Sequence, residues 1–273
     1  MRIIALLRDP VNLQALDRMV DMDLQLTDRA YIVTGATRGL GRATAEILVQ
    51  EGARVIMSSR SQEGVEASVQ ALGADSVIGV VADNTDPDTP LALIGAAQEK
   101  FGRLDGALIS VGGPPPGTVM TRSEAEWRTS FETVFLGAIR LSTAIAAELG
   151  EGGSLALVLS TSVKQPIGGL AISNGLRPGL AMVAKSLADE LGPRGIRVNG
   201  LLPGRVDTER VQELDAMSGD PEANRRDAEA AIPLRRYGEP AEFGRAAAFL
   251  LSPAAGYITG VMLPVDGGIT RSL

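Results

Sequence analysis

Short runs of apolar residues alternate along this chain with longer segments in which apolar residues recur at helical spacing. The apolar runs, which predict strands, are Ala30–Val33, Arg54–Met57, Val77–Val81, Gly106–Ile109, Leu155–Leu159 and Arg197–Leu201. The segments that predict helices are Arg42–Val49, the residues after Ser61, Leu91–Phe101, a long stretch from Glu124, and Leu176–Leu191. Strands that alternate with helices imply right-handed crossovers and a parallel sheet covered on both faces. The pattern therefore predicts an α/β fold, a doubly wound parallel sheet in three layers.

The chain of 273 residues contains no Gly/Ser-rich or charged linker, no internal repeat and no low-complexity tract that would divide it. We expect a single domain over residues 26–273, preceded by an N-terminal extension over residues 1–25. The extension has the pattern of an amphipathic helix; alternatively, Met22 begins a plausible shorter chain. Further on, Ser123 followed by Glu126 predicts a capping box at the start of the long helix.

Composition excludes several classes of function. The formal net charge of −7 opposes binding to nucleic acid or to an anionic membrane, because both require a positive protein surface. Without cysteine or histidine there is no disulfide, no thiolate or imidazole metal ligand, and no histidine-based triad. Charges follow the apolar start too soon for a signal peptide, and no segment reaches the ~18 uninterrupted apolar residues of a membrane helix. We expect a cytoplasmic protein with a small-molecule partner and no bound metal.

A glycine-rich turn lies between the first predicted strand and its helix. Glycines there allow a tight bend and a close approach of the backbone to a phosphate, while the helix N-terminus offers unpaired N–H donors to the anion. Three glycines alone are a weak signal, but this position favours a dinucleotide site of the Rossmann kind over a merely structural turn. The candidate cofactor-binding residues of the turn are Gly35, Thr37, Arg38, Gly39, Leu40 and Gly41.

The end of the second predicted strand indicates which dinucleotide is bound. An acidic residue expected there would bond the ribose 2′-hydroxyl and repel a 2′-phosphate, but the strand ends in Ser58, Ser59 and Arg60. A guanidinium at Arg60, with a second at Arg38, suits the 2′-phosphate and favours NADP(H) over NAD(H). The alternative is that both arginines are ordinary solvated surface residues.

Further motifs now identify a resemblance. The glycine spacing resembles that of short-chain dehydrogenases/reductases, as do Phe101–Asp105, Gly195–Asn199, and Pro203-Gly204 with Thr208. The most specific match is the run from Pro233 to Gly268, which looks like the 3-oxoacyl-(acyl carrier protein) reductase branch. The resemblance extends from about Leu26 to Gly268.

This resemblance implies positions for the cofactor. The glycine turn would hold the pyrophosphate, Asp83 would meet the adenine, and Pro203, Gly204 and Thr208 would lie by the nicotinamide. An alternative role for Asp83 is that of a turn or helix-capping aspartate. The resemblance also implies a homo-oligomer, a dimer or a tetramer.

The catalytic positions depart from the family pattern. The family's tyrosine falls at Ser173 and its lysine at Arg177, which keeps the four-residue spacing on one helix face. The family's serine is Ser162 or Ser160, which spacing alone does not separate, and either could instead serve backbone hydrogen bonding at a strand end. The family's asparagine falls at Val134.

Two hypotheses follow. The first is an NADP(H)-dependent oxidoreductase acting on a carbonyl or alcohol, in which Ser162, Ser173 and Arg177 stabilise the oxyanion and water or Lys164 completes proton transfer. The second is a catalytically silent NADP-binding homologue that serves as a sensor or oligomer subunit. The proline-rich residues 112–117 predict a stiff loop, which either forms a wall of the substrate pocket or only connects two elements. The polar segment Val206–Ala231 is expected to act as a lid over the pocket.

Overall fold

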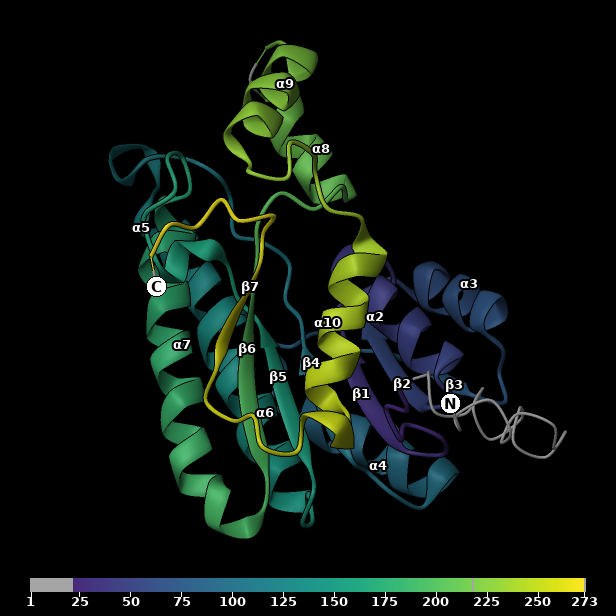
Figure 1. The fold of residues 1–273 in the computed structure, drawn as a ribbon. Coiled ribbons are helices and arrows are strands. Elements are labelled where there is room, and N and C mark those ends of the chain that lie inside the picture. Colours follow the sequence, from purple (N-terminus) through teal and green to yellow (C-terminus); the bar gives the residue numbers. More distant parts are fainter. Residues whose placement is uncertain (1–21, 218, 273) are drawn as a thin grey trace, which may run out of the picture.

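The computed structural model describes residues 22–217 and 219–272, so the N-terminal extension lies almost entirely outside the described residues. Seven parallel strands form one sheet in the order β3-β2-β1-β4-β5-β6-β7 (Figure 1). The strands are β1 (Ala30–Thr34), β2 (Arg54–Ser59), β3 (Val77–Val81), β4 (Gly106–Ile109), β5 (Ser154–Val158), β6 (Arg197–Pro203) and β7 (Met262–Val265). The doubly wound α/β fold is confirmed, and the first six strands lie at the predicted runs. Strand β7 was not predicted.

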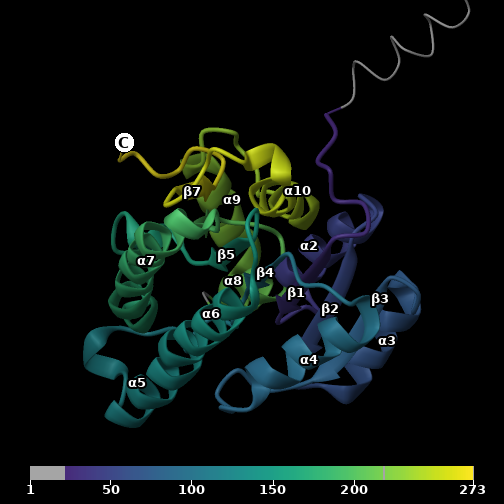
Figure 2. The same cartoon turned by 90° about the horizontal axis from the view of Figure 1, so that it is seen from below.

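Helices cover both faces of the sheet, which gives the three expected layers (Figure 2). One face carries α2 (Gly39–Gln50), α3 (Gln62–Leu72) and α10 (Pro240–Leu251), and the other carries α4 (Thr89–Phe101), α6 (Gly137–Glu148) and α7 (Ala171–Leu191). Single 3-10 turns lie at Val119–Thr121, Thr161–Val163, Gly192–Arg194 and Pro253–Ala255. Each face has its own apolar core, with Leu48 and Phe243 buried on the first and Leu141 and Leu180 on the second. The two cores fix the carboxyl edge of the sheet, from which the functional loops emerge.

The long predicted helix departs from α-helical geometry in its middle. Ser123 and Glu126 form the predicted capping box, in which Ser123 Oγ accepts from the Glu126 N–H at 3.3 Å. α5 (Glu124–Ser130) then passes through a π-helical turn (Phe131–Leu136) into α6. Such turns inside helices are frequent at functional sites. The stretch 124–148 is long and apolar enough to cross a membrane by length and composition only, and 44% of its apolar window is buried within the protein.

The segment Val206–Ala231, which we call the lid, stands beyond the carboxyl ends of the strands and contains α8 (Glu209–Ala216) and α9 (Pro221–Ala231) (Figure 1). The buried carboxylate of Asp215 ties the lid to the body of the domain. It accepts hydrogen bonds from Arg205 Nη1 at 2.8 Å, Asn224 Nδ2 at 2.8 Å and Tyr237 Oη at 3.0 Å. Burial raises the pKa of Tyr237 to about 12, so this phenol stays a proton donor to the carboxylate. The lid is therefore anchored at the end of α8 that lies away from the glycine turn.

Candidate active site

A cleft of about 1070 Å³ opens at the carboxyl edge of the sheet and gathers nearly all of the predicted site residues. Every predicted cofactor-binding residue lines it, namely Gly35, Thr37, Arg38, Gly39, Leu40, Gly41, Arg60, Asp83, Pro203, Gly204 and Thr208. Of the predicted catalytic residues, Ser173 and Arg177 line the cleft. Ser162 is not in the lining, although its Oγ lies 3.2 Å from Ser173 Oγ, whereas its alternative Ser160 does line the cleft. Residues from the lid and from the loop 112–115 complete its walls. The structure thus brings together residues that are far apart in the sequence.

The glycine turn is built so that only small residues fit. Gly35 has a φ of 58°, and a Cβ added to it would lie 2.9 Å from the carbonyl oxygen of Ser110. A Cβ on Gly41 would lie 2.4 Å from the carbonyl oxygen of Gly35, which no real side chain tolerates. Thr34 Oγ1 donates to the Ser110 carbonyl at 2.7 Å and accepts from the Ser110 N–H at 2.9 Å, so β1 and β4 are joined at the edge of the cleft.

This turn fits the phosphates of a dinucleotide. The N-cap residue of α2, Arg38, makes no side-chain cap, and the first turn of the helix carries no acidic residue. Its N–H groups and the positive end of the helix dipole are thus directed at the cleft. Nearby, Ser58 Oγ is buried and has no hydrogen-bond partner within the part of the chain that the structure describes. A buried polar atom of this kind in the lining of a cleft is consistent with a bound polar ligand.

The two arginines proposed for the 2′-phosphate have exposed side chains, 69% at Arg38 and 78% at Arg60. Arg60 Nη1 lies 4.0 Å from Asp83 Oδ2. The other oxygen of Asp83 accepts from the backbone N–H and the hydroxyl of Thr85, both at 2.9 Å. Asp83 therefore has the turn role that was considered as an alternative, and it also lines the cleft.

Two serines predicted to occupy catalytic positions, Ser162 and Ser173, contact each other. Ser162 Oγ lies 3.2 Å from Ser173 Oγ, and both side chains are buried. Ser162 belongs to the 3-10 turn Thr161–Val163, whereas Ser160 is the N-cap of that turn and accepts from the Ser162 N–H at 3.1 Å. The local hydrogen bonds thus give Ser160 a structural task, and they favour Ser162 as the partner of Ser173.

Arg177 lies one helical turn beyond Ser173 and is only 5% exposed. Its guanidinium donates to the carbonyl oxygen of Val158 and, at 3.3 Å, to that of Val111. Among the described residues it makes no ion pair with a carboxylate. Burial lowers the pKa of Arg177 to about 10, so the group stays charged at neutral pH although its charge is poorly solvated. The floor of the cleft is therefore electropositive.

Sequence reasoning missed the role of Asn174, which holds the loop before α7. Its Nδ2 donates to the Ile167 carbonyl at 2.8 Å, and its Oδ1 accepts from the Ile167 N–H at 3.0 Å. The loop before α7 is also paired with Gly117, whose N–H donates to Gly169 and whose carbonyl accepts from Ala171. The pairing of Gly117 has no local sequence signal, because it joins loops from different crossovers.

A small apolar cluster forms the wall beside the serines. It consists of Val111, Trp127, Val134, Ile172 and Leu176. Val134, which was predicted to occupy the family's asparagine position, is buried there. A Cβ on Gly175 would lie 2.8 Å from the Trp127 ring, so the ring packs directly on the helix that carries Ser173.

No tyrosine or lysine is among the residues that line the cleft in the described part of the chain. Lys164 is exposed and lies outside the lining. Tyr31 is buried in a core beneath the amino edge of the sheet, and Tyr257 is fully exposed. The proton donor of a carbonyl reduction must therefore come from another source.

Comparisons with known proteins agree with this geometry. A family model described as enoyl-(acyl carrier protein) reductase matches residues 35–270. The 3-oxoacyl-(acyl carrier protein) reductase FabG of Vibrio cholerae is 32% identical over 248 residues, which cover 90% of this chain and 99% of that protein. A solved short-chain dehydrogenase/reductase from Brucella melitensis, described as a glucose/ribitol dehydrogenase, has a TM-score of 0.86 and 28% identity, with 92% and 100% of the two chains covered. The structure of YwfH, described as an NADPH-dependent reductase involved in bacilysin biosynthesis, has a TM-score of 0.82 and 26% identity, with 90% and 99% covered.

Proposed function

The chain belongs to the short-chain dehydrogenase/reductase family, and from this premise we propose that it is an NADP(H)-dependent oxidoreductase that reduces a carbonyl group or oxidises the corresponding alcohol. One observation carries the proposal: the glycine turn shares a single cleft with the hydroxyl of Ser173 and the buried cation of Arg177. The relatives support a small substrate with a carbonyl group, such as a 3-oxoacyl thioester. We further propose a cytoplasmic homo-oligomer, a dimer or a tetramer.

The choice of NADP(H) rests on charge at the adenosine end of the cleft. Strand β2 ends without an acidic residue, and Arg38 and Arg60 line the cleft on either side of this end. Guanidinium groups bind phosphate with paired hydrogen bonds, whereas a carboxylate at the strand end would repel it. The neighbouring structure YwfH is described as NADPH dependent, which supports the same choice.

The chemistry follows from groups that stabilise charge without giving up a proton. A bound nicotinamide would supply or accept the hydride. Ser173 donates a hydrogen bond to the substrate oxygen, Ser162 supports the Ser173 hydroxyl through the 3.2 Å contact between their Oγ atoms, and the guanidinium of Arg177 stabilises the negative charge that develops there. A serine hydroxyl and a guanidinium are both very weak acids, so we propose that water completes the proton transfer.

The test combines binding with turnover. NADPH and NADH affinities are measured by the change in cofactor fluorescence, and NADPH oxidation is followed with a panel of ketones and acyl thioesters. We expect tighter binding of NADPH than NADH, and oxidation of NADPH with at least one carbonyl compound.

Arg60→Met should weaken NADPH binding by about tenfold and leave NADH binding nearly unchanged, because a phosphate contact is lost. Arg128→Met is the matched control, since Arg128 is an exposed arginine on α5 that pairs with Glu124 away from the cleft.

Two results would contradict parts of the proposal. NADPH binding without turnover of any carbonyl or alcohol would overturn the enzymatic role and support the catalytically silent homologue. Equal or tighter binding of NADH would overturn the assignment of NADP(H).

A further inference from the structure

The lid presents two carboxylates to the glycine turn. Glu209 and Glu213 are four residues apart on α8 and therefore share a helix face. Glu213 Oε1 lies 3.7 Å from Arg38 Nη1. Glu209 Oε2 lies 3.9 Å from the position that a Cβ would take on Gly39, the first residue of α2. Two negative groups thus lie at the very place that is built to receive an anion.

Both carboxylates are placed where a phosphate would be stabilised. The uncapped N-terminus of α2 and the guanidinium of Arg38 attract any nearby negative charge. A dinucleotide phosphate at the same turn would meet Glu209 and Glu213 at close range, and like charges at such a distance repel. The acidic face of α8 and the cofactor phosphates are therefore competitors for one electropositive site.

The same helix also contacts the substrate side of the cleft. Arg210 Nη1 lies 3.6 Å from Glu213 Oε2, and Arg210 Nη2 donates to the carbonyl oxygen of Pro114 at 2.8 Å. A Cβ on Gly113 would lie 3.1 Å from Arg210 Nε, so the side chain of Arg210 packs closely on this loop. A chain of polar contacts accordingly runs from Arg38 through α8 to the loop 112–115. A movement of Glu213 away from Arg38 would be transmitted to that loop.

We propose that Glu213, assisted by Glu209, is a built-in competitor for the cofactor phosphates that lowers the affinity for NADPH more than the affinity for NADH. In the cofactor-free protein the lid rests on the glycine turn through these carboxylates. The 2′-phosphate replaces Glu213 as the anion beside Arg38, and α8 is then released from the turn. This inference rests on the proposed NADP(H) binding and adds to it a residue that determines cofactor specificity.

The experiment uses the full-length protein with Glu213→Gln and with the double variant Glu209→Gln/Glu213→Gln. The control is Glu222→Gln, which removes one negative charge from the same lid at a side chain that is 91% exposed and pairs only loosely, at 3.8 Å, with Arg226. NADPH and NADH dissociation constants are measured by fluorescence. Hydrogen exchange of the α8 amides is measured with and without cofactor.

We expect Glu213→Gln to tighten NADPH binding about two- to fivefold, the range that a surface ion pair supports. The double variant should tighten it further, NADH binding should change less, and the control should match the wild type. In the absence of cofactor, the α8 amides should exchange faster in the double variant than in the wild type, and NADPH should speed exchange in the wild type.

The outcomes separate this inference from the proposed function. A wild type that binds NADPH but gives unchanged affinity in both variants would overturn the competition. Slower α8 exchange on adding NADPH to the wild type would overturn the release of the lid. A wild type that binds neither dinucleotide would overturn the proposed function itself, and the inference with it.

Discussion

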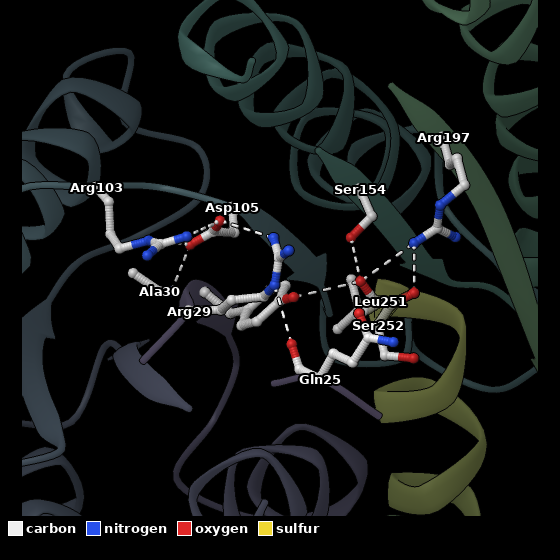
Figure 3. Close-up of polar contacts among 10 residues, drawn as sticks. Gln25, Arg29, Ala30, Arg103, Asp105, Ser154, Arg197, Leu251 and Ser252 are labelled. Atoms are coloured by element: carbon white, nitrogen blue, oxygen red, sulfur yellow. Dashed lines mark hydrogen bonds and ion pairs between the residues drawn. The ribbon is translucent and has the colours of Figure 1, made fainter. Parts of the chain in front are cut away.

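Each end of the sheet buries an arginine, and the two side chains differ in what balances their charge. At the amino end, Arg197 begins β6 and reaches the last turn of α10 (Figure 3). It donates to the carbonyl oxygens of Leu250 at 2.6 Å, Leu251 at 3.2 Å and Ser252 at 2.9 Å, with a longer contact to Ile258 at 3.4 Å. The last carbonyls of a helix have no partner within it and carry the negative end of its dipole. The carbonyl groups at the end of α10 therefore balance the positive charge of Arg197.

The neighbours of Arg197 complete this arrangement. The carbonyl oxygen of Leu251 also accepts from Ser154 Oγ at 2.6 Å and from Tyr31 Oη at 3.4 Å (Figure 3). Beside it, Asp105 accepts from Arg29 at 3.0 Å and from Arg103 at 2.7 Å. The polar groups drawn at this end are thus paired with one another within the protein, which is the pattern expected of a structural network.

Arg177, at the carboxyl end, has a much poorer set of partners. Its two acceptors are the last carbonyl of β5 and a carbonyl in the loop after β4, and neither lies at a helix C-terminus. The carboxyl ends of parallel strands are also where such sheets bind ligands. A buried cation without a counter-charge costs stability, and it is retained where a ligand or a transition state supplies the negative charge. The comparison indicates that Arg197 serves the fold, and it supports the proposed role of Arg177 in the reaction.

The largest expected effect comes from Arg177→Met. Removing a charge that stabilises the developing oxyanion should lower kcat by about 10²–10³-fold. The free energy of unfolding should fall less than in Arg197→Met, because the carbonyls of Val158 and Val111 lose a donor but a poorly solvated charge is removed at the same time. Steady-state rates with the best carbonyl compound of the panel, together with urea unfolding, test both statements. A kcat within about threefold of the wild type would contradict the assignment.

Arg177→Lys sharpens the same prediction by its pH dependence. In the wild type the positive charge persists below the pKa of about 10 and is lost as the pH rises through it. Burial depresses the pKa of a lysine as well, from a lower starting value. The alkaline limb of the kcat profile should therefore move to lower pH in Arg177→Lys. An unchanged limb would show that this charge does not take part in the reaction.

For Arg197→Met we expect a loss of stability with little change in kcat, the reverse of the result for Arg177→Met. The carbonyls at the end of α10 would lose a donor while they stay buried, which costs about 1–3 kcal/mol of the free energy of unfolding. The kcat of the folded fraction should stay within about twofold of the wild type, since the side chain lies at the opposite end of the sheet from the cleft. Urea unfolding and kcat measured on one preparation test the pair of expectations. A large loss of kcat with unchanged stability would overturn the distinction between the two ends.

Most of the fold could be predicted because it is encoded locally. Strand β1 and the turn at Gly35 show in a few consecutive residues, and the capping box at Ser123 needs only four. Strand β7 was missed because it contains Pro264, which weakens any strand pattern, and because it lies at the edge of the sheet. Helix α10 was also missed, although Phe243, Ala247 and Leu251 recur at helical spacing after a proline at its start.

The site could be predicted less fully, for a different physical reason. Spacing placed Ser173 and Arg177 on one face of a helix, because that relation is fixed within the helix itself. It did not separate Ser160 from Ser162, since the choice depends on a 3-10 turn that directs one hydroxyl to the backbone and the other to Ser173. The meeting of Arg38 with Glu213 had no sequence signal at all, because it depends on how the lid docks on the body of the domain.

The smallest change in stability is expected when the carboxylate partner of an exposed arginine is removed. Arg236 pairs with Glu242 through two hydrogen bonds, at 2.6 and 2.7 Å, and Glu242 also accepts from the Glu239 N–H at 2.8 Å. The bonds from Arg236, followed by the backbone bond, lower the pKa of Glu242 to about 2 from 4.5. A depressed carboxyl pKa contributes stability that is complete above pH 4.5 and is lost as the pH falls toward 2.

Because the Glu242 side chain is 38% exposed, solvent screens most of this contribution. Glu242→Gln should therefore lower the free energy of unfolding at pH 7 by less than about 1 kcal/mol. The difference from the wild type should shrink when urea unfolding is repeated at pH values below 4.5, where Glu242 becomes protonated in the unfolded chain. A difference that stays constant over this range would show that the carboxylate charge contributes nothing. Together with the results for Arg177 and Arg197, it would show that arginines affect the free energy of unfolding of this protein through their burial and not through ion pairs.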